Sequence, residues 1–245
     1  MKLNFFIILI LLIPLKVKSD QIYELVKIPN LEFYNNGEKG IRYLTANKNF
    51  SAGVGVNSVS CEKPEKNLLK HKFLLTEKNM ELYNKRFLKK INLRYIILCK
   101  NLSVSNISAI GFANPEMRTI VLNVNSDEKI FQRVIHHEIF HVIHKNFIEY
   151  FDQNEWEKLN DPEFKYSSCS TCKENVNLTP LSYTNGFFTD YARSTFSEDM
   201  AETFSFLVFD DEYSKIKITE DTIIKKKTDF IKENILRIWE GFKFK

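Results

Sequence analysis

The chain of 245 residues has few residues that interrupt helices and strands or cross-link them. It contains seven glycines, six prolines, four cysteines and two tryptophans. The glycines and prolines do not gather into a linker, and no internal repeat is present. Neither tethered modules nor a repeat architecture is therefore indicated. Hydrophobic residues make up 44% of the chain and charged residues 27%, which excludes a disordered or collagen-like chain and is typical of a globular protein.

Long hydrophobic runs are also missing, except at the N-terminus. Lys2 precedes an apolar run from Phe5 to Leu15, and Val17-Lys18-Ser19 offers compact residues at a cleavage position. This pattern predicts a signal peptide over residues 1–19, cut after Ser19. A membrane anchor is disfavoured because the run is shorter than the roughly 20 residues that cross a bilayer. We therefore expect a secreted or periplasmic protein with no membrane association after cleavage.

The mature chain lacks a marked excess of one charge. The predicted signal peptide holds three lysines and no acid, so its removal lowers the formal net charge from +4 to +1. A nearly neutral domain gives no electrostatic basis for nucleic-acid binding. The run Lys225-Lys226-Lys227 is expected to be the solvated face of a helix.

The few cysteines constrain the fold only loosely. In an exported protein, Cys61, Cys99, Cys169 and Cys172 permit two disulfides in any of three connectivities. The pair Cys169-Ser-Thr-Cys172 has no second pair of the kind that a structural zinc knuckle needs. A disulfide within a loop, or free thiols, is the favoured interpretation.

The order of apolar patterns indicates an α+β protein. Residues 20–70 are expected to form an N-terminal extension or small lobe, and residues 71–245 the main domain. Within the main domain the periodicity predicts a helix from residue 76 to about 88 and strands over residues 93–98 and 118–124. Further helices are predicted over residues 127–146, around 155–156, and over 197–208 and 220–239, with a polar loop at 160–190. Strands followed by helices are typical of the α+β class.

Four of the five histidines lie within one stretch, His136 to His144, of the predicted helix over residues 127–146. Two of them belong to the motif His137-Glu138-Ile139-Phe140-His141. At this spacing both imidazoles project from one helix face, as two ligands of a single zinc ion require. Glu138 would lie beside the metal, where it can take a proton from a zinc-bound water and pass it to a leaving amine. The alternative is a pair of core histidines that are hydrogen-bonded to the backbone.

A third ligand must come from elsewhere in the chain. Six residues after His141, where some zinc peptidases carry a third histidine, the chain has Phe147. His144 shares the helix face and is expected to support the site or to pack, whereas His136 points away from the metal.

The remaining source is a later glutamate. Ser197-Glu198-Asp199-Met200-Ala201-Glu202 opens the next strong helix, and Glu198 and Glu202 share one of its faces. One of these carboxylates can bind zinc while the other holds a ligand histidine. The alternative is that both merely favour the positive end of the helix dipole.

These residues resemble the zinc site of a known family. The motif H-E-x-x-H, followed by Tyr191-Ala192-Arg193-Ser194 and then by Glu198 and Ala201-Glu202, is similar to that of the anthrax-lethal-factor-like peptidases. The secreted bacterial Pro-Pro endopeptidases belong to that group. The chain also resembles a wider set of bacterial zinc metallopeptidases with an E-D-x-A-E helix. The resemblance covers two short blocks and does not extend through the N-terminal third.

The resemblance implies a gluzincin site with one catalytic Zn²⁺. His137, His141 and Glu198 would be the metal ligands, Glu138 the general base, and Glu202 a supporting hydrogen-bond partner. The implied fold is a zincin-like domain with a small mixed sheet, a helix that carries HExxH and a helical C-terminal part.

The resemblance also assigns a tyrosine and a substrate-binding strand. Tyr191 would donate a hydrogen bond to the oxyanion that forms during hydrolysis, with Tyr183 as the fallback donor. Gluzincins resemble one another in laying an extended peptide along an edge strand. The candidate strand is Arg118 to Val124, with Gly111-Phe112-Ala113 before it.

The sequence thus predicts a secreted zinc-dependent metalloendopeptidase, monomeric, that acts on protein or peptide substrates. One alternative is a zinc-binding pseudoenzyme on the same fold, although the retained Glu138 argues against it because a structural site needs no base. The other alternative is a disulfide-tied extracellular binding domain without metal. The sequence does not indicate the substrate or the cleavage-site preference.

Overall fold

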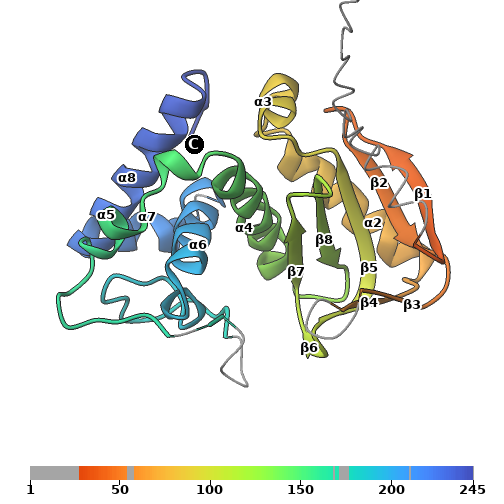
Figure 1. The fold of residues 1–245 in the computed structure, drawn as a ribbon, viewed down its shortest axis with the longest axis horizontal. Helices are drawn as coiled ribbons and strands as arrows, with labels where there is room; N and C mark the ends of the chain where they lie inside the picture. The colour runs from red at the N-terminus through yellow and green to blue at the C-terminus, as the bar shows by residue number, and fades with distance from the viewer. Residues whose placement is uncertain (1–27, 54–57, 168, 171–176, 210, 245) are drawn as a thin grey trace, which may run out of the picture.

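The computed structural model describes residues 28–53, 58–167, 169–170, 177–209 and 211–244 (Figure 1). The predicted signal peptide, residues 1–19, and Cys172 lie outside the described residues. No helix among the described residues is both long and apolar enough to cross a membrane.

The described residues form an α+β fold with a mixed sheet. Its strands are β1 (Leu31–Asn36), β2 (Arg42–Ala46), β3 (Phe50–Ala52), β4 (Val59–Glu62), β5 (Tyr95–Val104), β6 (Ile107–Ser108), β7 (Gly111–Asn114) and β8 (Thr119–Asn123). The α-helices are α2 (Lys66–Met80), α3 (Lys85–Lys90), α4 (Glu128–Asn146), α5 (Gln153–Glu157), α6 (Phe196–Phe209), α7 (Glu212–Glu220) and α8 (Thr222–Ile238). Two single 3₁₀ turns, η2 (Ile148–Tyr150) and η3 (Tyr191–Arg193), complete the described elements.

The long strand β5 organises the sheet. Its first half pairs in parallel with β2 on one side and with β8 on the other. Its second half pairs antiparallel with β4 and β6. On the β8 side the sheet ends at β7, which is antiparallel to β8 and has no second strand partner among the described residues. The strands of residues 31–62, from the predicted N-terminal lobe, therefore lie in one sheet with those of the main domain.

The sheet separates two apolar clusters, as alternating strand residues predict. Ile96 and Leu98 of β5 face the larger cluster, which contains the buried sides of α4 and α6. Ile97 and Cys99 face the smaller cluster, with Val121 of β8. In Figure 1, α4 lies between the sheet and the group of C-terminal helices. The position of α4 leaves its side chains next to both the edge strand β7 and α6.

Most of the predicted elements appear, but several of their bounds differ. The helix predicted from residue 76 is the end of α2 and, after a break, α3, because Asn84 caps a new helix by accepting from Arg86 N. The helix predicted over 220–239 is α8, and a helix that was not predicted, α7, precedes it. They divide at Asp221, whose carboxylate accepts from the backbone of Ile223 and Ile224 and so starts α8. The helix predicted over 127–146 is α4, which begins at Glu128 because Asp127 is its cap and accepts from Lys129 N and Ile130 N.

The interpretation of the lysine run as a solvated face is wrong for Lys227, which is fully buried. Its Nζ donates to Asp199 Oδ2 and to the carbonyl of Gly186, both at 2.7 Å. The same carboxylate accepts from Tyr166 Oη at 2.5 Å and from Trp156 Nε1 at 3.0 Å. Lys227 therefore joins α8, α6 and the predicted loop at residues 160–190 through one buried carboxylate.

The cysteines whose bonds the structure describes are oxidised. Cys61 on β4 is bonded to Cys99 on β5, with the two Cα atoms 5.7 Å apart. This bond excludes two of the three predicted connectivities. Cys169 is also disulfide-bonded. A disulfide between strands is typical of proteins that fold outside the reducing cytoplasm, which supports the extracytoplasmic location predicted from the N-terminus.

Candidate metal centre

Helix α4 brings the histidine motif into the interior. Apolar residues occupy most of its circumference, and its buried positions run almost continuously from Phe131 to His144. His137 and His141 lie one turn apart, and both face α6. Burying two imidazoles is strongly unfavourable unless their nitrogens have hydrogen-bond or metal partners.

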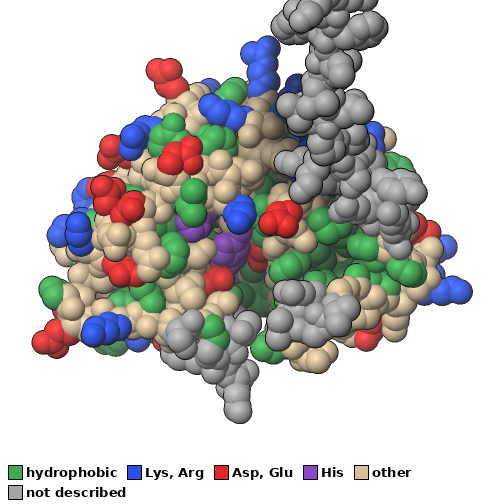
Figure 2. Space-filling model, viewed as in Figure 1, with side chains coloured by type: hydrophobic (Ala, Val, Ile, Leu, Met, Phe, Trp, Pro, Cys, Tyr) green, Lys and Arg blue, Asp and Glu red, His purple; other side chains and the backbone are tan. Residues whose placement is uncertain are grey.

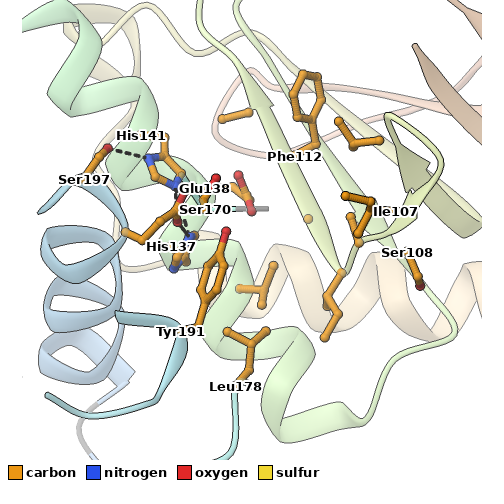
Figure 3. Close-up of a pocket in the computed structure, with 17 residues that line it drawn as sticks. Ile107, Ser108, Phe112, His137, Glu138, His141, Ser170, Leu178, Tyr191 and Ser197 are labelled. Carbon is orange, nitrogen blue, oxygen red and sulfur yellow. Dashed lines mark hydrogen bonds and ion pairs between the residues drawn. The ribbon is translucent and has the colours of Figure 1, made fainter. Parts of the chain in front are cut away.

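Three possible ligand atoms converge between α4 and α6 (Figure 3). His137 Nε2 and His141 Nε2 are 3.0 Å apart. Glu198 Oε2 lies 3.0 Å from the first and 3.2 Å from the second. Donor atoms at about 2.0–2.2 Å around a tetrahedral zinc ion are roughly 3.3 Å from one another, so these spacings suit one ion. Among the described residues, this is the one group of three His, Cys, Asp or Glu side chains that can hold a metal ion.

Glu198 reaches this position because of how α6 begins. Thr195 Oγ1 accepts from the backbone N–H of Glu198 at 3.2 Å, so Thr195 caps the helix. Glu198 thus occupies the position where a glutamate usually returns to bond the capping residue. Its carboxylate turns instead toward the two imidazoles. Their hydrogen bonds and charges hold the pKa of Glu198 well below its ordinary value, although burial acts in the opposite direction.

Glu138 lies on the floor of the cavity and is 6% exposed. Burial raises its pKa above the ordinary value, and His137 and His141 oppose that shift. The carboxylate makes no ion pair within 4 Å among the described residues, unlike Glu198. A carboxylate that is buried, unpaired and open to a cavity can exchange a proton with a molecule in that cavity.

Glu202 fixes the second ring nitrogen of His137. One carboxylate oxygen accepts from His137 Nδ1 at 2.9 Å, and the other accepts from Thr189 Oγ1 at 2.8 Å. Arg133 Nη1 is 3.9 Å from this second oxygen. Burial would raise the pKa of Glu202, but these partners lower it below the ordinary value. The carboxylate therefore stays ionised and holds the imidazole with Nε2 toward the converging atoms.

Sequence reasoning did not single out Arg133 or Thr189. Arg133 precedes His137 by one helical turn, and its Nη2 donates to the carbonyl of Leu178 at 2.6 Å. The signal for Arg133 in the sequence is its place on the same helix face as the histidine motif, one turn before it. Thr189 lies in a polar loop, and nothing in its sequence context separates it from its neighbours.

The other two clustered histidines lie outside the convergence point. His136 contacts Tyr83 Oη at 2.7 Å and Asn79 Oδ1 at 3.2 Å on the far side of α4, as its position in the helix predicts. His144 is buried, and its Nδ1 is 3.3 Å from Ser197 Oγ. Neither belongs to the possible ligand set.

Of the two candidate tyrosines, only Tyr191 is at the site. Its ring centre is 6.0 Å from that of His137, and it lines the cavity (Figure 3). Burial, followed by the charges of Glu198 and Glu138, raises its pKa well above the ordinary value, so its hydroxyl stays a donor. Tyr183 is 87% exposed and does not line this cavity. The structure therefore removes Tyr183 as the fallback donor.

A cavity of about 390 Å³ opens in front of these groups, between β6–β7 and η3. Figure 2 shows the histidines in the hollow, with hydrophobic side chains beside it. Apolar residues from the sheet side, including Ile107 and Ile110, form much of its wall, and Leu178 lies in the lining as well. The cavity is thus a largely apolar cleft with its ionisable groups at one end.

The strand that borders the cleft is β7, which corrects the candidate Arg118 to Val124. That segment is β8, which pairs with β5 and β7 on its two sides and so has no free edge. The backbone N–H of Asn123 donates to the carbonyl of Ile110, which fixes the phase of the β7–β8 ladder. The main-chain groups of Gly111 and Ala113 then point away from β8, toward the open edge. The sequence could not show which of the two strands lies at the edge of the sheet, because that depends on pairing between residues far apart in the chain.

The chain is similar to known proteins in sequence and in fold. Residues 41–240 match a family described as "Putative zinc-binding metallo-peptidase". A solved structure of a putative zinc-binding metallo-peptidase from Bacteroides caccae is similar in fold, with a TM-score of 0.53 and 17% sequence identity. The similarity covers 83% of this chain and 82% of that chain. No curated protein matches the chain. Because the family match spans most of its length, the chain belongs to this family of zinc-binding metallo-peptidases.

Proposed function

We propose that the protein is an exported zinc metalloendopeptidase of the gluzincin type, with a site like that of the anthrax-lethal-factor-like peptidases. The observation that carries the proposal is the convergence of His137 Nε2, His141 Nε2 and Glu198 Oε2 within hydrogen-bond distance of one another, beside an apolar cleft. These three residues would hold the ion. When bound, zinc would supply the Lewis acidity that activates water and polarises a peptide carbonyl.

Glu138 would act as the general base. Its carboxylate faces the cavity from the same helix turn as His137, and it takes the proton from the attacking water. The protonated carboxyl then returns that proton to the amine that leaves. Burial favours this second state because an uncharged carboxyl costs less to desolvate than a carboxylate.

Tyr191 would stabilise the charge that develops on the carbonyl oxygen. Its phenol is a hydrogen-bond donor at neutral pH and lines the cavity across from the sheet edge. A donor that is already in place costs no reorganisation when the charge forms, and such groups are worth about 10²–10³ in kcat.

The substrate would lie along β7 as an extended peptide. Gly111 and Ala113 present main-chain donors and acceptors at the open edge, and such groups bind a peptide as an added strand. This mode recognises the backbone of an internal segment, which fits protein or peptide substrates and endopeptidase activity. We expect a monomer, because the site draws all its groups from one chain.

The test is the variant Glu138→Gln compared with the wild type, both loaded with zinc. A diverse peptide library is digested and the products are read by mass spectrometry. We expect one zinc per chain in both proteins, cleavage by the wild type, and a loss of at least about 10²-fold in the variant. Glu128→Gln, at the exposed start of the same helix, serves as the matched control and should cleave normally.

Two outcomes would contradict the proposal in different ways. A wild type that binds zinc but cleaves nothing would support a pseudoenzyme. A wild type that binds no zinc would support a disulfide-tied binding domain.

A further inference from the structure

The two candidate ligand histidines differ in how their second ring nitrogen is held. His137 Nδ1 meets the carboxylate of Glu202, as described above. His141 Nδ1 meets no carboxylate but lies 3.4 Å from Ser197 Oγ, and Figure 3 shows this contact. Ser197 Oγ in turn lies 3.3 Å from His144 Nδ1. A serine on α6 therefore bridges two histidines that lie one turn apart on α4.

The direction of the two hydrogen bonds follows from which nitrogen of His141 carries the proton. Nε2 of His141 faces His137 and Glu198, so a neutral ring that offers this nitrogen to a metal carries its proton on Nδ1. Nδ1–H then donates to Ser197 Oγ. The hydroxyl has one proton of its own, and among the described residues the acceptor that remains within reach is His144 Nδ1.

His144 is suited to accept. Its ring is packed against Phe140, Phe151 and Phe196, with ring centres 5.8–6.0 Å away. Burial lowers the pKa of His144 below its ordinary value, so its ring is neutral at physiological pH. Within the described part of the chain its Nε2 has no hydrogen-bond partner. The polar contact that orients this ring is thus the one with Ser197.

Ser197 is not needed to start its helix. The cap of α6 is Thr195, whose hydroxyl accepts from the backbone of Glu198. The hydroxyl of Ser197 is therefore free to serve the two imidazoles. A purely local role in helix capping does not explain its position between them.

We propose that Ser197 and His144 are positioning residues that hold the His141 imidazole with Nε2 toward the metal. The chain of hydrogen bonds runs from His141 Nδ1–H to Ser197 Oγ and from the Ser197 hydroxyl to His144 Nδ1. This inference rests on the zinc site of the proposed function but not on peptide turnover. In this proposal His137 and His141 bind the ion, and His144 acts on it indirectly, through Ser197 and His141.

The first experiment measures the zinc dissociation constant of the full chain against a competing chelator. We expect Ser197→Ala to weaken zinc binding by about 10- to 100-fold, the range found for partners of metal-ligating histidines. Ser197→Thr keeps the hydroxyl and should bind zinc nearly as tightly as the wild type. Ser205→Ala is the matched control, because that serine lies on the same helix and its hydroxyl donates to the carbonyl of Glu202.

The second experiment separates positioning from folding. His144→Phe keeps an aromatic ring in an aromatic pocket and should weaken zinc binding as Ser197→Ala does. The double variant should lose no more than the larger single loss, because both changes break one chain of hydrogen bonds. The Tm of the zinc-free Ser197→Ala protein should equal that of the zinc-free wild type.

Three results would overturn the inference. Unchanged zinc affinity in Ser197→Ala would show that the bridge does not act on His141. Additive losses in the double variant would show that Ser197 and His144 act separately, and a lowered Tm of the zinc-free variant would show a structural role. If the wild type itself bound no zinc, the proposed function would fail first, before any variant was compared.

Discussion

At the scale of single residues, Gly111 is notable because its backbone does not require glycine. Its φ is not among the positive values of the chain, so an L side chain is conformationally allowed. A Cβ added there would instead collide with Glu138 Oε1, and it would lie 2.5 Å from Val134 Cγ1 and 2.7 Å from Glu138 Cγ. The glycine therefore lets the proposed base lie directly against the edge strand.

We predict that Gly111→Ala lowers kcat for peptide cleavage by about 10-fold or more, because a displacement near 1 Å at a reacting group can cost about 10² in rate. Zinc content should not change, since the atoms nearest that Cβ belong to Glu138 and Val134 and to none of the three candidate ligands. Kinetics on a peptide found in the library screen, with zinc analysis, would check this. Ala113→Gly, two residues along the same strand face, is the control. An unchanged kcat in Gly111→Ala would contradict this prediction, because it would show that the added Cβ does not displace the Glu138 carboxylate from its working position.

At the scale of elements, the start of α8 is held by Asp221. Its carboxylate accepts from the backbone of Ile223 and Ile224, from Thr184 Oγ1 at 2.6 Å and from Gly186 N at 2.7 Å. Burial would raise its pKa, but these donors hold the pKa below the ordinary value of 3.8. One charged side chain thus begins a helix and fastens the preceding loop to it.

The lowered pKa predicts a pH dependence. A carboxyl with a depressed folded-state pKa contributes stability above its unfolded-state pKa, and this contribution is lost as the pH falls through the folded-state value. Asp221→Asn keeps the shape but removes the charge, so we expect it to lower the free energy of unfolding by about 1 kcal/mol at pH 7. Denaturant titrations should show this difference shrinking below pH 4. A difference that stays constant down to pH 2 would contradict the assignment.

At the scale of the whole molecule, the disulfide and the candidate metal site lie on opposite faces of the sheet. Cys61 and Cys99 belong to the smaller apolar cluster, whereas α4 packs into the larger one. The bond closes a loop of 38 residues. Closing a loop of this length restricts the unfolded chain and stabilises the fold by about 3–4 kcal/mol.

The double variant Cys61→Ala/Cys99→Ala should therefore lose about 3–4 kcal/mol of unfolding free energy but still bind one zinc per chain. Denaturant unfolding and metal analysis of the same preparation would measure both. Loss of zinc binding in a variant that remains folded would show that the two faces are coupled through the sheet.

Much of the site could be predicted because its signals are local. The spacing of His137 and His141 fixes a shared face on any helix, and the acids at the start of residues 197–208 mark both a helix and a ligand source. The partners that complete the site could not be predicted in this way. Ser197 and Arg133 act through contacts between helices, which depend on how α4 and α6 cross.

The fold shows the same division between local and long-range information. Short apolar segments located β8 and the first half of β5, and the structure buries both faces of these stretches. The edge position of β7 and the burial of Lys227 depend on which elements pack together. A lysine in a run of three has the local pattern of a solvated face. Its burial depends on two distant acceptors, the carboxylate of Asp199, 28 positions earlier, and the carbonyl of Gly186.

The buried ion pair between Asp199 and Lys227 also determines the order in which α6 and α8 can pack. Asp199 follows Glu198 directly, and its counter-cation belongs to α8, the last helix of the described chain. A chain that is still being synthesised or exported has the acidic helix long before it has Lys227. An unpaired carboxylate resists burial, so α6 reaches its final packing only when α8 arrives. The proposed hydrolytic site is therefore complete only once α8 has packed against α6.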